Sequence, residues 1–302
     1  LPDGEVFRIL ARDQSASRRA AAALALRSRT ASGEACVAAL TLALDDSDLN
    51  VRVAAARSLA FFGSAAKPAA SRLCPWVLAR EPLLRQAALA GLVGIGSAAP
   101  EALEPLLILA LSPYAESDAE TSTLLGYALR AHAPAAAVRL SEALASPRLE
   151  AAVRAARALR RVGELAEPAK EALLKAALTT EAELVKESLG ALGAIGAQAR
   201  FAVPTLLRFL TYDAAAWRMA AAEALGQIGF DTAEGDKEGI VESLIPVLLD
   251  HEPDVAWAAY VALYCIGEPA VPKVRELVEL AEAEPPFYAL RVLARLKADP
   301  EQ

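Results

Sequence analysis

Residues 51 to 63 read VRVAAARSLAFFG, and residues 217 to 229 read WRMAAAEALGQIG. The two stretches share their arrangement of small and apolar residues position for position, and both end in glycine. Related stretches occupy residues 84 to 96, 184 to 196 and 255 to 267, and a weaker copy lies near His132. A pattern that recurs along a chain in this way indicates a repeat protein.

The closing glycines set the length of the repeat. Gly63 and Gly96 are 33 residues apart, as are Gly163 and Gly196, and then Gly196 and Gly229. The interval from Gly96 to Gly163 is about two repeats long, and a longer final interval of 38 residues indicates a short insertion. Periods of this size are typical of helical solenoids.

Apolar residues within the stretch follow helical spacing. Val51, Ala55, Leu59 and Phe62 are separated by four, four and three residues, so they share one buried face of a helix. The glycine that ends the stretch can adopt the positive φ that a helix C-terminus requires. In several copies a proline follows within a few residues, where a second helix is expected to begin.

Second helices are predicted in the stretches AVPTLLRFL at residues 202 to 210 and LIPVLLD at residues 244 to 250. Asp48 and Asp254 precede or open the next apolar stretch, as expected for residues near a helix N-terminus. Two helices in about 33 residues cannot close a core alone, so neighbouring units must stack. The sequence therefore predicts an all-α protein, a right-handed α-solenoid of about eight helical hairpins.

We expect a single solenoid over residues 1–302, with an N-terminal capping repeat at 1–44, core repeats at 45–280 and a C-terminal cap at 281–302. The first helix is predicted near Asp3 to Leu10. The acidic insertion at residues 231 to 239 is predicted to be an exposed loop.

Three short words carry a family resemblance: VR-x-AAA at 51–56, AVP-x-LL at 202–207 and ALG-x-IG at 224–229. The repeat resembles HEAT repeats, and more closely the HEAT-like repeats first noted in bacterial phycobilin lyases, over nearly the whole chain. The resemblance implies that arginines in one register bridge to an acidic residue of an adjacent turn. These arginines are Arg19, Arg52, Arg85 and Arg218, and Ala152, Val185 and Ala256 stand in their place in the C-terminal half.

The resemblance also implies that the VR-x-AAA helix lines a concave surface, with the residues two, six and nine positions after its first residue facing the groove. The candidate partner-binding residues are Arg57, Tyr127, Arg130, Arg157, Arg160, Lys186, Met219, Trp257 and Tyr264. The same register predicts exposure of Val53, Gln86, Thr123, Val153, Glu223 and Val261. Arginine and aromatic residues dominate binding hot spots, so we expect this groove to take an acidic, or mixed acidic and aromatic, segment of another protein.

A second interpretation of the same residues is structural. The arginines of the middle repeats would then only solvate an alanine-rich helix, and Trp257 and Tyr264 would pack against the terminal cap.

Composition restricts the functions that remain. The chain of 302 residues has 55% hydrophobic residues and a formal net charge of −7, so it is expected to be globular and to repel phosphate backbones and anionic membranes. The longest nearly uncharged stretch, residues 86 to 100, is shorter than the roughly 20 residues of a membrane span. The chain begins at Leu1 without an initiator methionine, so we expect a processed or truncated form, with the cytoplasm favoured as its compartment and export as the alternative.

Motifs of cofactor and metal sites are incomplete. The glycines at 94 and 96 have the spacing of a dinucleotide fingerprint, but a helix rather than a strand precedes them. The residues after Asp46-Ser47-Asp48 lack the glycine and glutamate that a calcium loop requires. The three cysteines are widely separated, and neither His132 nor His251 lies in a nucleophile motif. We therefore expect no cofactor, no metal and no catalytic residue.

The leading hypothesis is a non-enzymatic scaffold that binds a partner protein along its concave surface. The resemblance leaves two alternatives. One is a bilin chromophore lyase or a helper subunit of such a lyase, and the other is a HEAT-like DNA-binding protein, which the acidic composition disfavours.

Overall fold

The computed structural model describes residues 2–29, 33–230, 234–281 and 286–297. Within these ranges all regular structure is helical and no strand occurs, which confirms the all-α prediction. The chain divides into two compact units, unit 1 over Leu1–Ala136 and unit 2 over Ala137–Gln302, and each is described by itself.

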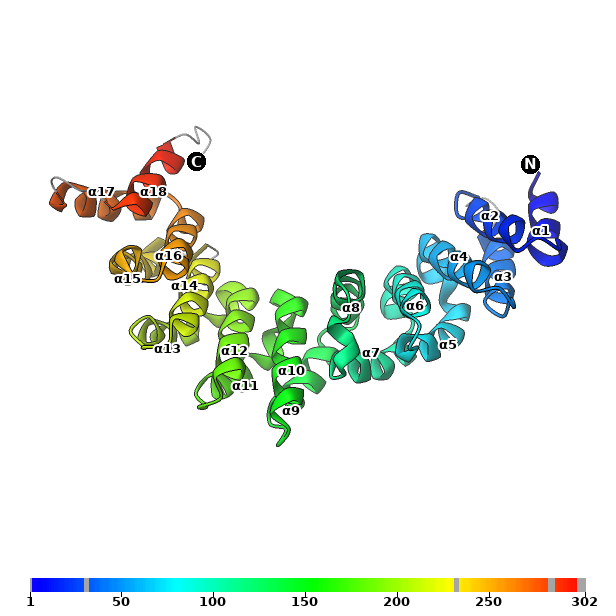
Figure 1. Ribbon diagram of the computed structural model, residues 1–302, viewed down its shortest axis with the longest axis horizontal. Coiled ribbons are helices and arrows are strands. Elements are labelled where there is room, and N and C mark those ends of the chain that lie inside the picture. The colour runs from blue at the N-terminus through cyan, green and yellow to red at the C-terminus, as the bar shows by residue number, and fades with distance from the viewer. Residues whose placement is uncertain (1, 30–32, 231–233, 282–285, 298–302) are drawn as a thin grey trace. The chain divides into compact units, whose positions relative to one another are not determined.

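Unit 1 is a series of helices that double back on one another (Figure 1). They are α1 (Asp3–Arg12), α2 (Ala16–Leu26), α3 (Gly33–Ala43), α4 (Leu49–Leu59), α5 (Ala70–Leu73), α6 (Pro82–Ile95), α7 (Leu103–Ala110) and α8 (Ala119–Ala131). Short 3₁₀ turns join several of them, such as η2 (Ala60–Ala69) after α4.

Unit 2 continues the same pattern. Its helices are α10 (Leu149–Val162), α11 (Lys170–Ala177), α12 (Ala182–Ile195), α13 (Val203–Phe209), α14 (Ala215–Phe230), α15 (Glu234–Leu244), α16 (Pro253–Ile266), α17 (Val271–Leu280) and α18 (Phe287–Lys297). Helix α9 (Ala135–Leu144) spans the boundary between the units.

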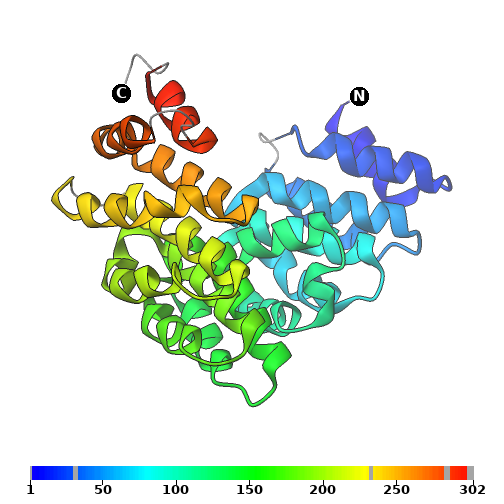
Figure 2. The same cartoon turned by 60° about the vertical axis from the view of Figure 1, so that its left-hand side comes forward.

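In each unit the even-numbered helices pack against one another in sequence. In unit 1, α2 packs on α4, α4 on α6 and α6 on α8, and in unit 2, α10 packs on α12, α12 on α14, α14 on α16 and α16 on α18. Figure 2 shows α12, α14 and α16 side by side from a second direction. We call these helices the even-helix layer of their unit. Odd-numbered helices pack on the other side of the hairpins, and this stacking of paired helices is a helical solenoid.

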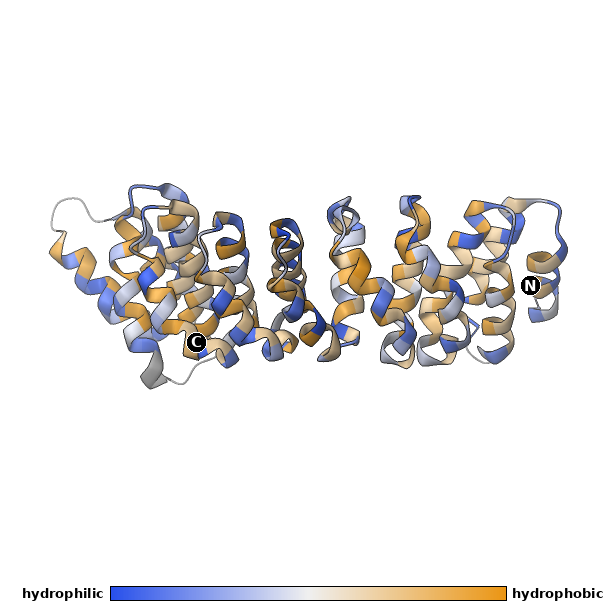
Figure 3. Ribbon diagram, turned by 90° about the horizontal axis from the view of Figure 1, so that it is seen from below, coloured by the Kyte–Doolittle hydropathy of each residue, from blue (hydrophilic) through white to orange (hydrophobic). Residues whose placement is uncertain are grey.

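The predicted apolar face forms the core. Val51, Ala55 and Leu59 of α4 are completely buried, whereas Phe62 is only partly buried because it follows the end of the helix. Hydrophobic and hydrophilic residues lie on the same helices in both units (Figure 3), as expected when each helix buries one face. Glycines bring the even helices close together: a Cβ atom at Gly226 would lie 2.6 Å from the Cα atom of Ala262.

Five of the closing glycines have the predicted positive φ. They are Gly63, Gly96, Gly163, Gly196 and Gly267. The prediction was wrong for Gly229, because α14 continues through it to Phe230. A Cβ atom at Gly229 would lie 2.9 Å from Cγ1 of Ile266, so this glycine permits close packing rather than ending a helix.

The insertion also differs from its prediction. Residues 234 to 239 lie in helix α15 rather than in a loop, and residues 231 to 233 are outside the described residues. The second helix predicted at 244 to 250 is instead the end of α15 followed by the 3₁₀ turn η9 (Pro246–Leu249). Helix α15, which contains residues 234 to 239 of the insertion, is the second helix of this hairpin. Pro246 therefore follows the end of the α-helix rather than beginning a new one.

The recurring arginines donate hydrogen bonds to backbone carbonyls of the turn that precedes their own helix. Arg52 donates hydrogen bonds to the backbone carbonyls of Asp46 (2.7 Å) and Ser47 (2.9 Å). Arg19 makes equivalent bonds to the turn before α2 and also binds the Asp46 carboxylate of the next repeat, with Nε and Oδ2 2.7 Å apart. Asp48 caps α4 as predicted, accepting hydrogen bonds from the first N–H groups of the helix.

The expected bridge to an acidic residue is also present at Arg218, which binds Asp250 at 2.7 Å. Arg85 is fully buried and donates to Ser117 Oγ at 2.7 Å, while the Asp118 carboxylate lies 3.6 Å away. The bridge is therefore confirmed for three of the four arginines. Arg52 makes no ion pair among the described residues, and its carbonyl bonds alone hold the turn.

Candidate protein-binding surface

All nine candidate residues lie on the even-helix layers. Unit 1 contains Arg57 in α4 and Tyr127 and Arg130 in α8, and unit 2 contains Arg157 and Arg160 in α10, Lys186 in α12, Met219 in α14, and Trp257 and Tyr264 in α16. The Tyr127 side chain is 56% exposed and Trp257 is 44% exposed. The other seven are partly or fully exposed.

Two residues of the same register are buried, contrary to the prediction. Gln86 is only 8% exposed because its amide reaches across to Asp118, 3.0 Å away. Val153 is 7% exposed because it contributes to the packed face of α10. Position in the repeat therefore predicts exposure only where no neighbouring side chain covers the site.

In unit 1 an exposed ion pair links two helices of the even-helix layer. Arg57 of α4 binds Glu120 at the start of α8, with Nη2 and Oε1 2.9 Å apart, and both side chains are about half exposed. Nearby, burial works against the ionised form of Asp118, but hydrogen bonds from Thr121, Ser117 and Gln86 outweigh it and lower the pKa of Asp118 to about 2. This carboxylate is a structural N-cap for α8.

In unit 2 the predicted basic residues are paired with glutamates of α12. Arg157 Nε lies 2.9 Å from Glu187 Oε1, and Arg157 also binds Glu183. Arg160 lies 3.8 Å from Glu187, and Lys186 lies 3.1 Å from Glu183. Hydrogen bonds from Lys186 and Arg157 lower the pKa of Glu183, which favours the charged form of this carboxylate.

These contacts reduce the positive charge that the sequence indicated. The three basic residues 157, 160 and 186 all pair with Glu183 or Glu187, so these two carboxylates compensate part of their positive charge. Arg130 belongs to unit 1, whereas Arg157, Arg160 and Lys186 form a basic cluster within unit 2. Glu183 and Glu187 were not among the predicted residues, although their spacing of four residues places them on one helix face.

At the end of unit 2 the aromatic candidates pack against α18. The Trp257 ring lies 5.0 Å from the Tyr260 ring and 6.1 Å from the Tyr288 ring. Arg295 of α18 lies over Tyr264, 5.5 Å from the ring centroid. Trp257 and Tyr264 therefore both contact the terminal helix, as the structural interpretation predicts. Trp257 nevertheless keeps 44% of its surface exposed.

A second aromatic group was not identified from the sequence. Phe209 stacks on Tyr212 with ring centroids 4.8 Å apart, and Trp217 meets the Phe209 ring edge-on at 5.8 Å. The indole N–H of Trp217 donates to the carbonyl of Ala182, 3.1 Å away. The close sequence spacing of these three aromatic residues was the available signal.

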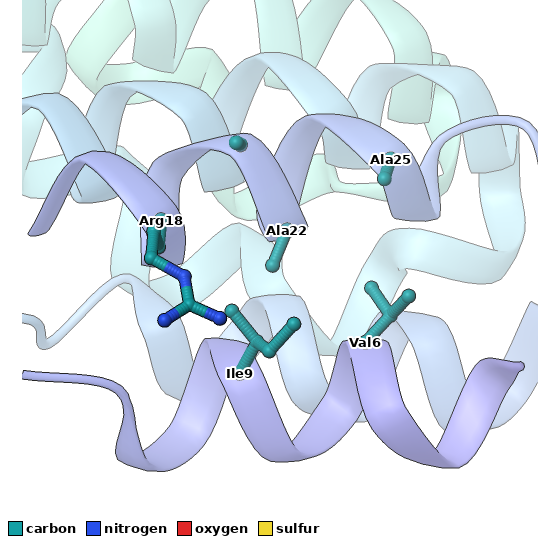
Figure 4. Close-up of a pocket in the computed structure, with 6 residues that line it drawn as sticks. Val6, Ile9, Arg18, Ala22 and Ala25 are labelled. Atoms are coloured by element: carbon teal, nitrogen blue, oxygen red, sulfur yellow. The ribbon is translucent and has the colours of Figure 1, made fainter. Parts of the chain in front are cut away.

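Each unit contains a cavity among its described residues. The first holds about 340 Å³ between α1 and α2, where Val6 and Ile9 face Ala22 and Ala25 with Arg18 at the rim (Figure 4). Arg18 pairs with Asp13 at 3.0 Å. The second holds about 420 Å³ beside α15 and α17, where Lys273 pairs with Glu242 at 3.0 Å. Neither cavity brings together an acid, a base and a nucleophile.

The described residues contain no group of three or more His, Cys, Asp or Glu side chains that could hold a metal ion. Asp46, the first residue of the incomplete calcium motif, binds Arg19 instead. His132 is buried, whereas His251 is 79% exposed beside Asp250 and Glu252. No single described helix has the length and apolar composition of a membrane span; only α16 together with the segment Glu268–Leu280 does, as a pair bent by 120°.

No protein-family model matches this sequence, and no curated protein matches it. Solved structures do match its fold. Yeast importin-beta (Kap95p) is 14% identical with a TM-score of 0.63 over 97% of this chain, and Kap95 in complex with Nup1 gives a TM-score of 0.65. Kap121p bound to Ste12p is 14% identical with a TM-score of 0.62 over 97% of this chain. The chain spans 40% to 46% of the length of these karyopherin chains. The protein therefore has a HEAT-like helical-repeat fold.

Proposed function

We propose that this chain is a non-enzymatic scaffold that binds a segment of a partner protein along its even-helix layer. One observation supports the proposal above the others: Tyr127 and Trp257 lie at predicted groove positions and remain about half exposed. Large aromatic side chains gain most from burial, so an exposed aromatic residue on the even-helix layer of each unit favours an interaction surface.

The comparisons support binding of proteins in general. The matched Kap121p structure contains Ste12p, and the matched Kap95 structure contains Nup1. The identity is 14% and each match covers less than half of the karyopherin chain. The comparison therefore supports protein binding in general and does not identify a partner. We propose that the even-helix layer is the concave surface, and that residues 1–44 and 281–302 cap a single solenoid.

The partner segment in this proposal is acidic with aromatic or apolar residues. Arg157, Arg160 and Lys186 supply positive charge that Glu183 and Glu187 compensate only in part, while Met219, Trp257 and Tyr264 supply apolar surface on the following helices. Arg57, Tyr127 and Arg130 form the corresponding surface of unit 1. A partner whose charges complement this surface would associate faster at low salt.

Site-specific photo-cross-linking tests the proposal directly. A benzoylphenylalanine residue is introduced at position 127 or 257, cross-linking is carried out in extract of the source cells, and captured proteins are identified by mass spectrometry. We expect the same partner at both positions and none at position 201, where Phe201 is 40% exposed outside the even-helix layer. The captured partner is then purified, and its binding is measured against Tyr127→Ala, Trp257→Ala and the control Phe201→Ala.

Equal capture at position 201, or no loss of binding in either even-layer variant, contradicts the proposal. The two alternative functions have no specific support among the contacts described. Covalent attachment of a bilin to an apo-phycobiliprotein would establish the lyase alternative, and salt-sensitive binding to duplex DNA would establish the DNA-binding alternative.

A further inference from the structure

Helix α18 is a positively charged surface in an acidic protein. Its sequence, FYALRVLARLK, contains Arg291 and Arg295 four residues apart and no acidic residue, although the chain carries a net charge of −7. Ala289, Val292 and Leu293 are buried. Phe287 (64% exposed), Leu290 (43% exposed) and Arg291 remain on the surface.

Three aromatic rings surround the guanidinium group of Arg291. Its Cζ atom lies 5.4 Å from the centre of the Phe287 ring, 5.5 Å from the Tyr260 ring and 5.6 Å from the Trp257 ring. Tyr288 packs against all three rings, with centroid distances of 5.3 to 6.1 Å. Cation–π contacts hold a guanidinium group in place without using its in-plane N–H donors.

Several other arginines of the protein use those donors for contacts within the chain. Arg19 and Arg218 bind aspartates and backbone carbonyls, and Arg157 binds two glutamates. Within the described part of the chain, Arg291 has ring contacts and no carboxylate or carbonyl acceptor. The cluster therefore positions a charged fork and leaves its hydrogen-bonding capacity for another molecule.

We propose that Arg291, framed by Trp257, Tyr260 and Phe287, binds a carboxylate side chain in an acidic segment of a partner protein. A guanidinium group binds a carboxylate through two parallel N–H···O bonds, which a planar fork matches in geometry and charge. The exposed side chains of Trp257, Phe287 and Leu290 contact an apolar residue beside that carboxylate, whereas Tyr260 is buried beneath them. This inference rests on the proposed function, because it specifies the chemistry of the partner segment at one end of the layer.

Fluorescence anisotropy with a defined probe tests the assignment on the full chain. The probe is a fluorescein-labelled peptide with the core Leu-Glu-Glu-Leu, and its matched control has glutamine in place of both glutamates. We expect the glutamate peptide to bind at least tenfold more tightly than the glutamine peptide. Arg291→Ala should weaken binding of the glutamate peptide at least tenfold, and Arg291→Lys should weaken it severalfold because lysine keeps the charge but lacks the fork.

Arg275→Ala is the matched control, because Arg275 is an exposed arginine of α17 for which the described contacts include no aromatic ring. We expect its binding to remain within twofold of the unmodified protein. Circular dichroism of every variant verifies that helix content is kept, and Arg291→Lys provides the readout if Arg291→Ala loosens α18. Equal binding of the two peptides, or equal losses in Arg291→Ala and Arg275→Ala, overturns the inference.

Two further outcomes separate this inference from its premise. If a phosphoserine peptide, or inorganic phosphate as competitor, binds more tightly than the glutamate peptide, the carboxylate assignment is overturned. If partner cross-linking at positions 127 and 257 persists while Arg291→Ala leaves peptide binding unchanged, the inference fails and the scaffold function stands. If peptide binding depends on Arg291 but cross-linking at positions 127 and 257 captures no partner, the scaffold function is overturned and the carboxylate-binding role of Arg291 stands.

Discussion

Arg218 of α14 and Asp250, which precedes α16, form a two-pronged ion pair between successive repeats. Nε lies 2.7 Å from Oδ2 and Nη2 lies 2.8 Å from Oδ1, and both side chains are nearly buried. The same arginine also donates to the carbonyls of Tyr212 and Asp213. One residue thus fastens its own turn and joins it to the next repeat.

We predict that Arg218→Ala lowers the free energy of unfolding by about 3–5 kcal/mol, because it leaves a nearly buried carboxylate and two carbonyls without their donor. Arg52→Ala is the matched control, since Arg52 binds two carbonyls but no carboxylate. Urea denaturation followed by circular dichroism measures both. The interpretation fails if Arg52→Ala costs as much as Arg218→Ala.

Much of this fold was predictable, because helices and repeats follow from short-range spacing. The apolar positions around Val51 and the glycine at 63 specify a helix and its end without reference to the rest of the chain. Gly229 shows where short-range spacing does not determine the end of a helix. The same glycine pattern continues as helix there, because an insertion downstream supplies a different hairpin partner.

The candidate surface was less predictable than the fold. The sequence correctly places the arginines 157 and 160 on one exposed surface, but it does not show that Glu187 of the next helix pairs with them. This pairing compensates part of their positive charge. Arg291 lies outside the recurring stretch, and its aromatic surroundings arise from the packing of α18 on α16, which the repeat pattern does not specify. Charge pairing between repeats depends on side-chain geometry that periodicity does not specify.

Acid should weaken the protein below about pH 4. Hydrogen bonds from Arg19 and Arg218 lower the pKa values of Asp46 and Asp250, and the pKa of Asp118 falls to about 2. A carboxyl whose folded pKa lies below its unfolded value of about 4 contributes stability that is complete above that pH and is lost as pH falls through the folded pKa. We expect the urea midpoint to drop between about pH 4 and pH 2. Asp118→Asn should reduce this drop, and an unchanged drop would contradict the assignment.

A separate loss of stability is expected at milder pH. Burial lowers the pKa of His132, and the charge of Glu101 opposes this effect only in part. Protonation is therefore easier in the unfolded chain, so stability declines as pH falls below the unfolded histidine pKa of about 6.5. His132→Gln should remove the decline between about pH 6.5 and pH 5, measured as the thermal midpoint, whereas substitution of the exposed His251 by Gln should leave it in place.

Gly94 tests how closely α6 approaches the segment that follows α4. A Cβ atom there would clash with the backbone of Ala60, which cannot move aside as a flexible side chain can. Gly94→Ala should therefore destabilise the protein by roughly 1–3 kcal/mol or more. Gly4→Ala is the opposite case, because nothing lies within 4 Å of its Cβ position and alanine favours a helix by about 1 kcal/mol. Thermal unfolding of both variants should show opposite signs, and equal signs would mean that the close approach is wrong.

Glu187 controls how much positive charge the unit 2 surface offers to an acidic partner. Its side chain is only 8% exposed and lies between Arg157 and Arg160, with Lys186 4.0 Å away. Glu187→Gln keeps the shape and one hydrogen-bond acceptor but removes the negative charge. We expect the partner identified by cross-linking to associate severalfold faster, with a steeper dependence on salt, because association rates follow the local potential. Stopped-flow measurements at several ionic strengths provide the rates.

Glu223→Gln is the control, because it makes the same charge change on α14, where the described contacts include no ion pair to Glu223. If it accelerates association as much as Glu187→Gln does, net charge rather than the paired arginines determines the rate.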